Sequence, residues 1–289
     1  MPPVPPRFRI APTPSGYLHL GNGVNFALTA ALAQTQEAHL ALRVDDLDAA
    51  RTREAYRADI RETVAWLFPP SLAKPLLATG VSQSSRLDRY AVVLEGLRQN
   101  RLVFGCSCSR RELAAAREAS GADVNDYPGT CAERGLDLDA PDVAWRMRGS
   151  GVVVRQKDAR PSYQLASLTD DVDAGTTHLV RGEDLRGSTA IQRVLAQALT
   201  APLPVATPQG WPDFARFGDV RSYHHDLLLG DGGEKLSKSA GAQSLRALRA
   251  STAGPSAVFA KAAQLLGHSG VTDLPGLTYV LGQRPVTWD

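Results

Sequence analysis

The sequence predicts an α/β protein built on a doubly wound parallel sheet, with an insertion and a short helical C-terminal part. The first observation is the order of the segments, because strand-like and helix-like stretches alternate from residue 7 onward. The second is that turns rich in glycine, proline and serine follow two of the strand-like stretches. The third is a composition of 43% hydrophobic and 21% charged residues, which is typical of a packed core.

The N-terminal part contains two strand–helix pairs. An alanine- and leucine-rich helix follows the first strand, and a helix that starts at a threonine and stops at two prolines follows the second. The elements are a strand at Arg7–Ala11, a turn at Pro12–Gly16, a helix at Leu20–Ala33, a strand at His39–Val44, an acidic turn at Asp45–Asp48 and a helix at Thr52–Leu67. Parallel strands need such crossover helices, so this order predicts a parallel sheet.

The remaining elements follow from apolar runs, helical spacing and one serine cap. They are a helix at Leu87–Gln99 that leads to Leu102–Phe104, a cysteine segment at Cys106–Cys131, strands at Val143–Met147, Val152–Arg155, Tyr163–Thr169, His178–Arg181 and His225–Leu229, and helices at Ser188–Leu199 and Pro255–Leu266. The cysteine segment has glycine, serine, asparagine and proline near its end. We therefore expect it to be an insertion outside the sheet.

Charge, hydropathy and cysteine content narrow the cellular setting. The formal net charge is only +2, which neither requires nor excludes a nucleic-acid partner, because a local basic face fits a balanced total. No run of about 18 apolar residues is present, so no membrane span or membrane partner is expected. The three cysteines lie in one short stretch, which argues against a disulfide framework and suits a reducing compartment. We expect a cytoplasmic protein.

A first phosphate-binding signal lies between the first strand and the first helix. Ligands of parallel sheets bind at the carboxyl ends of the strands, and a helix N-terminus offers free N–H groups to phosphate. The residues that could contact ATP there are Pro12, Ser15, Gly16, His19, Gly21 and Asn22. His19 could donate a hydrogen bond to an oxygen that gains charge during phosphoryl displacement. The alternative is a tight turn with an ordinary capping histidine.

A second signal is the basic segment Gly232–Ser239. Its lysines, Lys235 and Lys238, stand three positions apart among glycine and serine residues. Two positive charges at this spacing can stabilise a triphosphate and the transition state of its displacement. The alternative is a solvated basic loop.

Taken together, the two signals resemble the HIGH and KMSKS signatures of the class I aminoacyl-tRNA synthetases. They stand here as His19-Leu20-Gly21-Asn22 and Lys235-Leu236-Ser237-Lys238-Ser239. The resemblance implies a Rossmann-type catalytic core, the use of ATP with Mg²⁺, and catalytic roles for His19, Lys235 and Lys238. Asn22 is a departure, since many members carry a second histidine at this place.

Further segments are similar to the glutamyl branch of this family. They are Arg9–Gly16, Arg43–Asp48, Asp170-Asp171 and Val180–Leu185. The resemblance implies L-glutamate as substrate, bound by Arg9, Ala11, Thr13, Asp45, Tyr163 and Arg181. The arginines can pair with carboxylates, and Asp45 can hold the ammonium group. The alternative pairs Arg181 with Glu183 or Asp184 and makes Asp45 a helix cap. The branch usually has Glu at position 45, and Asp is one methylene shorter, which is roughly 1.5 Å.

The cysteine segment resembles the zinc module of a short paralogue group within the same branch. That module has Cys-x-Cys followed by Tyr-x-x-x-Cys, which corresponds to Cys106, Cys108, Tyr127 and Cys131. Thiolates are well suited to zinc. The resemblance implies a structural zinc bound by these four residues, or by three cysteines and water. The alternative is three reduced, partly buried thiols.

The resemblance also implies a domain division and a reaction. We expect the two halves of the catalytic domain at residues 7–105 and 143–240, the zinc insertion at 106–142, and a helical segment at 241–289 without an anticodon-binding domain. Members of the short group activate glutamate without tRNA and transfer it to the queuosine base at the wobble position of tRNA(Asp). Two alternatives remain open. One is an enzyme that charges a tRNA 3′ end, and the other is a non-catalytic binding module descended from a synthetase.

Overall fold

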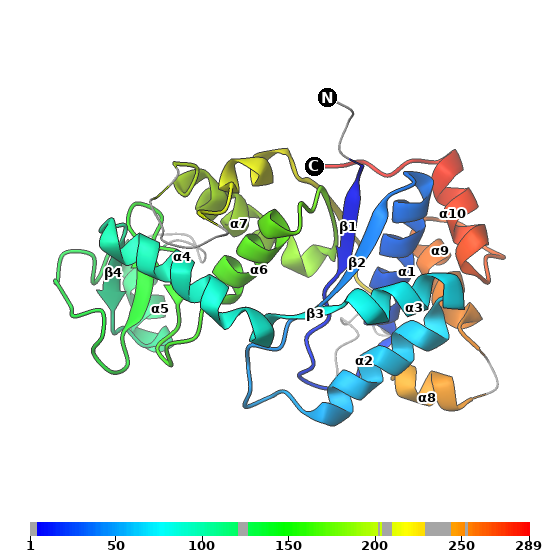
Figure 1. Cartoon of the computed structure of the whole chain (residues 1–289), viewed down its shortest axis with the longest axis horizontal. Coiled ribbons are helices and arrows are strands. Elements are labelled where there is room, and N and C mark those ends of the chain that lie inside the picture. The colour runs from blue at the N-terminus through cyan, green and yellow to red at the C-terminus, as the bar shows by residue number, and fades with distance from the viewer. Residues whose placement is uncertain (1–4, 121–126, 202, 204–209, 229–243, 252–253) are drawn as a thin grey trace. The chain divides into compact units, whose positions relative to one another are not determined.

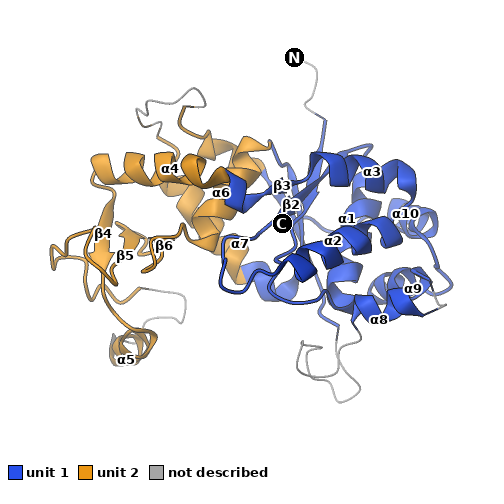
Figure 2. Ribbon diagram, turned by 60° about the horizontal axis from the view of Figure 1, so that its bottom comes forward, with its two compact units in different colours: residues 1–85, 175–186, 220–289 blue, residues 86–174, 187–219 orange. Residues whose placement is uncertain are grey.

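The computed structural model describes residues 5–120, 127–201, 203, 210–228, 244–251 and 254–289. The chain forms two compact units (Figure 2). The first unit contains residues 1–85, 175–186 and 220–289, and the second contains residues 86–174 and 187–219. Each unit therefore contains segments that are far apart in the sequence. The expected insertion, 106–142, lies within the second unit.

The first unit is built on a parallel sheet, which confirms the predicted fold class. Its described strands have the order β3-β2-β1-β7-β8, and every neighbouring pair is parallel. The strands are β1 (Arg7–Ile10), β2 (His39–Val44), β3 (Val81–Ser82), β7 (His178–Gly182) and β8 (Arg221–His225). Figure 1 shows β1 and β2 running side by side. Because β1 lies in the middle, the turn that follows it stands at the centre of the carboxyl edge.

Helices of the first unit pack against this sheet and against each other. They are α1 (Leu20–Thr35), α2 (Glu54–Leu67), α3 (Pro70–Thr79), α8 (Leu245–Ala250), α9 (Ser256–Leu265) and α10 (Leu274–Gln283). Helix α1 contacts β1, α9 and α10 and is buried along most of its length. Its Val24, Ala27 and Leu28 are fully buried in the same core cluster as Phe8 and Ile10 of β1. The apolar composition of α1 is thus explained by its central place.

The second unit combines helices with a separate antiparallel sheet. Its described helices are α4 (Leu87–Gln99), α5 (Arg110–Ser120), α6 (Tyr163–Asp173) and most of α7 (Arg186–Ala198), with a 3₁₀ turn at Phe214–Asp219. The strands are β4 (Val103–Cys106), β5 (Ala144–Met147) and β6 (Val153–Arg155), in the order β4-β5-β6. The cysteine segment therefore leaves from the end of β4, outside the parallel sheet.

Three predicted elements were wrong or misplaced. The strand predicted at Tyr163–Thr169 is the helix α6, which begins where Ser162 Oγ accepts a hydrogen bond from the Leu165 N–H. The strand predicted at His225–Leu229 ends at His225, because β8 occupies Arg221–His225. Helix α7 begins at Arg186, so Ser188 lies inside the helix and is not its cap.

None of the helices in the described part of the chain is long and apolar enough to cross a membrane.

Candidate functional site

The turn between β1 and α1 is fixed by hydrogen bonds within the chain. His19 precedes α1 with extended backbone angles, φ −108° and ψ 171°. The Asn22 Oδ1 atom accepts a hydrogen bond from the His19 N–H at 3.0 Å, which is one half of a capping box. A Cβ atom on Gly21 would lie 3.0 Å from His19 Cε1, so glycine allows the imidazole to fold over the helix start. Asn22, which stands where many family members have a second histidine, thus binds the backbone of the N-cap residue of α1.

The upstream part of the turn is tied to β2. The Pro12 carbonyl accepts the Asp45 N–H at 2.9 Å, and the Thr13 carbonyl accepts the Ser15 N–H at 2.9 Å. Pro12 is buried, whereas Thr13 is exposed and Ala11, Ser15 and Gly16 are half-buried. The ends of β1 and β2 are therefore held together where the turn begins.

Three buried arginines lie on one face of the sheet. Phe8 of β1 is in register with Leu40 of β2 and with His178 of β7. Side chains alternate between faces along a strand, so the side chains opposite to the Phe8 face are those of Arg9, Arg43 and Arg181. These residues are 7%, 6% and 3% exposed. Two of them, Arg9 and Arg181, are the predicted carboxylate-binding residues, and they stand on neighbouring strands.

Asp45 pairs with the third arginine. The Arg43 Nε atom donates to Asp45 Oδ1 at 2.6 Å, and Arg43 Nη2 donates to Asp45 Oδ2 at 3.1 Å. Both residues are buried. The neighbouring Asp46 accepts hydrogen bonds from the Ser84 N–H and Oγ at 2.7 and 2.8 Å, and it pairs with Arg57. The acidic turn thus links the end of β2 to α2 and to the segment after β3.

A buried histidine near the first helix was missed by the sequence analysis. The Asn25 Nδ2 group of α1 donates to the Val180 carbonyl and lies 3.1 Å from His225 Nε2, at the end of β8. The His225 Nδ1 atom lies 2.9 Å from the Asp226 carbonyl, which requires a proton on Nδ1. Burial lowers the pKa of His225, which favours the neutral ring, and a neutral ring with a proton on Nδ1 accepts at Nε2. Asn25 therefore joins α1 to β7 and β8.

The other predicted residues fall into different parts of the chain. Glu183, which is one of the two alternative partners suggested for Arg181, pairs with Arg186 at 2.6 Å. Tyr163 is the first residue of α6, in the second unit, and its side chain is exposed. Lys235 and Lys238 lie outside the described residues.

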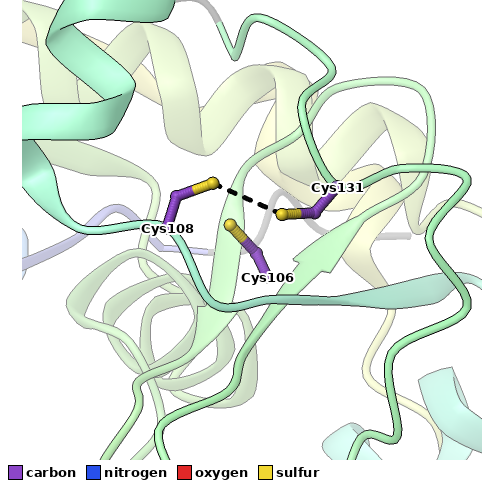
Figure 3. Close-up of side chains that lie close together, drawn as sticks. All are labelled: Cys106, Cys108 and Cys131. Atoms are coloured by element: carbon purple, nitrogen blue, oxygen red, sulfur yellow. Dashed lines mark hydrogen bonds between the residues drawn. The ribbon is translucent and has the colours of Figure 1, made fainter.

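The three cysteines converge in the second unit (Figure 3). The sulfur atoms of Cys106, Cys108 and Cys131 all lie within 4.8 Å of one another, and the Cys108–Cys131 distance is 3.3 Å. Burial and the neighbouring sulfurs raise the pKa of Cys108 to about 12. Burial opposes the shift at Cys131, but hydrogen bonds from Cys108, the Ser107 backbone and Tyr127 lower its pKa to about 7. Three sulfur atoms this close could all ionise only beside a positive charge, so a divalent cation suits the cluster.

Tyr127 is held against the cysteines. Its hydroxyl group accepts the Cys131 N–H at 2.7 Å and donates to Cys106 Sγ at 3.7 Å. The Arg146 guanidinium lies over the ring, 4.3 Å from its centroid. Gly151 has φ +68°, and a Cβ atom there would lie 2.3 Å from Tyr127 Cβ. The four residues of the predicted zinc module are therefore brought together, with the phenol oxygen on the cluster.

Comparisons with known proteins agree with this geometry. The family described as tRNA synthetases class I (E and Q), catalytic domain, matches residues 6–138 and 142–209. The chain is 30% identical to a glutamyl-Q tRNA(Asp) synthetase of Rhodobacter capsulatus, over 86% of this chain and 96% of that protein. It is 36% identical to the glutamyl-Q tRNA(Asp) synthetase of Parasynechococcus marenigrum, over 84% of this chain and 77% of that protein.

A solved structure shares the fold. The glutamate tRNA ligase of Elizabethkingia meningosepticum, in complex with its amino acid, superposes with a TM-score of 0.67 at 22% identity. The superposition covers 95% of this chain and 64% of the ligase. The family model matches most of the sequence, and relatives at 30% and 36% identity cover most of the chain, so together they show the family. The chain belongs to the class I tRNA synthetases of the glutamate and glutamine (E and Q) family.

Proposed function

We propose that this chain is a glutamyl-Q tRNA(Asp) synthetase, which activates L-glutamate with ATP and transfers it to the queuosine base at the wobble position of tRNA(Asp). The observation that carries this proposal is the cluster of Cys106, Cys108 and Cys131 with Tyr127 against it. This arrangement fits the zinc module of the short glutamyl paralogues. The two similar curated proteins described above carry the same name.

In the first step, an oxygen of the glutamate α-carboxylate attacks the α-phosphorus of ATP. The bond from the α-phosphorus to the bridging oxygen breaks, so glutamyl-adenylate forms and pyrophosphate leaves. The turn residues Pro12, Ser15, Gly16, Gly21 and Asn22 would hold the nucleotide at the start of α1. His19 would donate a hydrogen bond to the phosphate oxygen that gains charge, and Lys235 and Lys238 would stabilise the triphosphate. When bound, Mg²⁺ would neutralise part of the phosphate charge.

Glutamate recognition would use the arginine face. Arg9 and Arg181 are buried on neighbouring strands and can each bind a carboxylate with two hydrogen bonds. Asp45 would interact with the ammonium group, while Arg43 already holds both of its oxygens. The remaining proposed contacts are those of Ala11, Thr13 and Tyr163.

In the second step, a hydroxyl of the queuosine cyclopentene ring attacks the carbonyl carbon of the adenylate. An ester forms, AMP leaves, and the hydroxyl proton passes to solvent or to the departing phosphate. The adenylate is already activated, so no protein nucleophile is needed. The zinc would have a structural role in the second unit, where it would join the end of β4 to the loop at Cys131. We place the enzyme in the cytoplasm, where its tRNA partner is found.

The test is pyrophosphate exchange into ATP with each of the twenty amino acids, followed by transfer of labelled glutamate. We expect exchange with glutamate and ester formation on tRNA(Asp) that contains queuosine. The matched control is the same tRNA without queuosine, which should accept no glutamate. Charging of a tRNA 3′ end would instead favour a glutamate–tRNA ligase. Absence of exchange with every amino acid would favour a binding module.

A further inference from the structure

The residue before His19 has both of its backbone polar groups engaged by distant segments. The Leu18 N–H donates to Asp59 Oδ2 of α2 at 2.7 Å. The Leu18 carbonyl accepts the Leu245 N–H of α8 at 2.9 Å, and His19 forms an isolated antiparallel bridge with Ser244. The turn between β1 and α1 is therefore bound on one side by α2 and on the other side by Ser244 and the first residue of α8.

A buried ion pair joins those two sides. Arg249 of α8 donates from Nη2 to Asp59 Oδ1 at 2.8 Å, so the two oxygens of Asp59 bind different segments. Arg249 Nη1 donates to Thr63 Oγ1 of α2 at 2.6 Å. The side chain of Asp59 is only 1% exposed and that of Arg249 is 11% exposed. Because a buried carboxylate needs a cation and hydrogen-bond donors, Arg249 and the Leu18 N–H both help to satisfy Asp59.

Aromatic contacts connect the same three segments, which are the turn between β1 and α1, α2 and α8. The rings of Tyr17 and Tyr56 meet edge to face, with centroids 5.1 Å apart. The Arg246 guanidinium of α8 lies 4.8 Å from the centroid of the Tyr17 ring. The turn thus has a second link to α2 and to α8, next to the first.

We propose that Asp59 and Arg249 are positioning residues for amino-acid activation, which hold the ATP-binding turn in the conformation that the reaction needs. They act through Leu18 and do not touch the reacting atoms. The inference rests on the proposed function, because it concerns the same activation site. It goes further by assigning a role to two residues outside both signature motifs. In sequence, α8 comes shortly after the segment with Lys235 and Lys238.

The test compares two acidic residues that meet the same nitrogen of Arg249. Asp59 accepts from Nη2 and also from Leu18, whereas Glu62 Oε2 accepts from Nη2 at 2.7 Å with a side chain that is 65% exposed. In Asp59→Asn, the amide NH₂ would face either the Leu18 N–H or the guanidinium. Both are donors, so one of the two hydrogen bonds would be lost. Glu62→Gln removes the other carboxylate without touching the turn. Arg249→Gln breaks the pair from the opposite side, and Arg249→Lys keeps the charge.

The readouts are ATP binding by calorimetry without glutamate, and glutamate-dependent pyrophosphate exchange. For Asp59→Asn and Arg249→Gln we expect the Kd for ATP to rise about tenfold and the exchange kcat to fall about tenfold, with the KM for glutamate changed by less than about twofold. Glu62→Gln should stay within about twofold of wild type in all three quantities, and Arg249→Lys should recover most of the ATP affinity. A merely structural defect would lower the active fraction and leave the Kd for ATP and the KM for glutamate unchanged.

Several outcomes would overturn the inference. One is an unchanged Kd for ATP in folded Asp59→Asn and Arg249→Gln. Another is an equal effect of Glu62→Gln. If Asp59→Asn does not fold, Arg249→Gln decides the matter. Should the wild type bind ATP without glutamate-dependent exchange, the proposed function fails, and the calorimetry still decides the role of the pair.

Discussion

At the scale of single residues, Asp45 and Arg43 form a buried ion pair in which a short carboxylate meets two nitrogen atoms of the guanidinium group. The pair is bidentate, and both side chains are buried beside the carboxyl edge of the sheet. Glutamate at position 45, as in the glutamyl branch, would place its carboxylate roughly 1.5 Å farther out. The Arg43 fork fits the shorter side chain, so the two positions are matched to each other.

The substitution Asp45→Glu should therefore weaken glutamate binding. An extra methylene in a packed, buried site costs about 1–3 kcal/mol, and it would break the bidentate geometry with Arg43. We expect the KM for glutamate in pyrophosphate exchange to rise about tenfold. The control is Asp139→Glu, since Asp139 forms a similar bidentate pair with Arg98 but is 54% exposed. Tighter glutamate binding in Asp45→Glu would show that the position has room, and a preference of the wild type for aspartate would show a changed pocket.

The sequence can point to a candidate residue when its partners lie close to it along the chain, and it cannot when they are distant. His19, Gly21 and Asn22 could be placed together from the sequence, because a helix start is built from neighbouring residues, and the structure has them at the start of α1. Asp59 could not, because its partners, Leu18 and Arg249, are 41 and 190 positions away. Nothing in the local pattern of α2 distinguishes such an aspartate from an exposed one.

At the scale of elements, the cysteine cluster joins β4 to a loop that has few apolar residues. Cys106 is the last residue of β4, and the described apolar cluster here consists of Phe104 and two cysteines with a few half-buried neighbours. Such a small cluster buries little surface, so a metal would supply much of the local stability.

We expect the purified protein to contain about one zinc per chain. Cys108→Ser should lose most of it, because a neutral hydroxyl is a poor zinc ligand. The Tm should fall as well, and a loss of about 2 kcal/mol corresponds to roughly 4–8 °C for a chain of this size. Elemental analysis and calorimetry measure both quantities. Ser107→Ala, an exposed position between the two cysteines, is the control and should keep its zinc. A metal-free wild type with the same Tm after chelation would contradict the assignment.

A buried histidine in the parallel sheet should make stability depend on pH. His178 of β7 stacks on Phe8 with ring centroids 4.6 Å apart and meets the Trp288 ring edge-on. Burial, with a smaller contribution from Arg221, lowers the pKa of His178 from 6.5 to about 4. Between these values the unfolded chain binds more protons than the folded one, so the free energy of unfolding rises with pH. This stability is lost as the pH falls from about 6.5 to about 4.

His178→Phe should make this dependence shallower, because phenylalanine keeps the stacking and cannot be protonated. The measurement is chemical unfolding at several values between pH 7 and pH 4. Burial also lowers the pKa values of His224 and His225, so part of the slope should remain. His39→Gln is the control, since His39 is exposed. An unchanged slope in His178→Phe would show that this ring does not carry the effect.

The errors among the predicted elements have physical reasons. In α6, Leu165, Leu168 and Val172 recur at helical spacing, but Tyr163 at the start and Thr169 at the end of the predicted segment favoured a strand. Strand β8 has the polar sequence Arg-Ser-Tyr-His-His, and the apolar residues that suggested a strand come just after it. As the outer strand of the described sheet, β8 tolerates polar residues that a central strand would not.

At the scale of the whole molecule, the two compact units divide the predicted functions. Arg9, His19, Asp45 and Arg181 all belong to the first unit, whereas the cysteine cluster and Tyr163 belong to the second. The parallel sheet could be anticipated from alternating strands and helices, because parallel strands need crossover connections. The interruption of the first unit by two long segments could not, since no local signal marks where a chain leaves one core for another.

Activation of glutamate should not require tRNA. The turn that would bind ATP is held by contacts within the first unit, namely those of Leu18 with Asp59 and Leu245, of His19 with Asn22, and of Pro12 with Asp45. The buried arginines are likewise positioned by strand pairing within that unit. These described residues are therefore already held in place by the protein itself, and a tRNA is not needed to position them. We expect the rate of glutamate-dependent pyrophosphate exchange without tRNA to lie within about twofold of the rate with tRNA(Asp). The control is a second measurement with an unrelated tRNA, which separates specific activation from a general effect of polyanions. Exchange that depends strictly on tRNA would mean that the intramolecular contacts do not suffice, and that the nucleic acid completes the site.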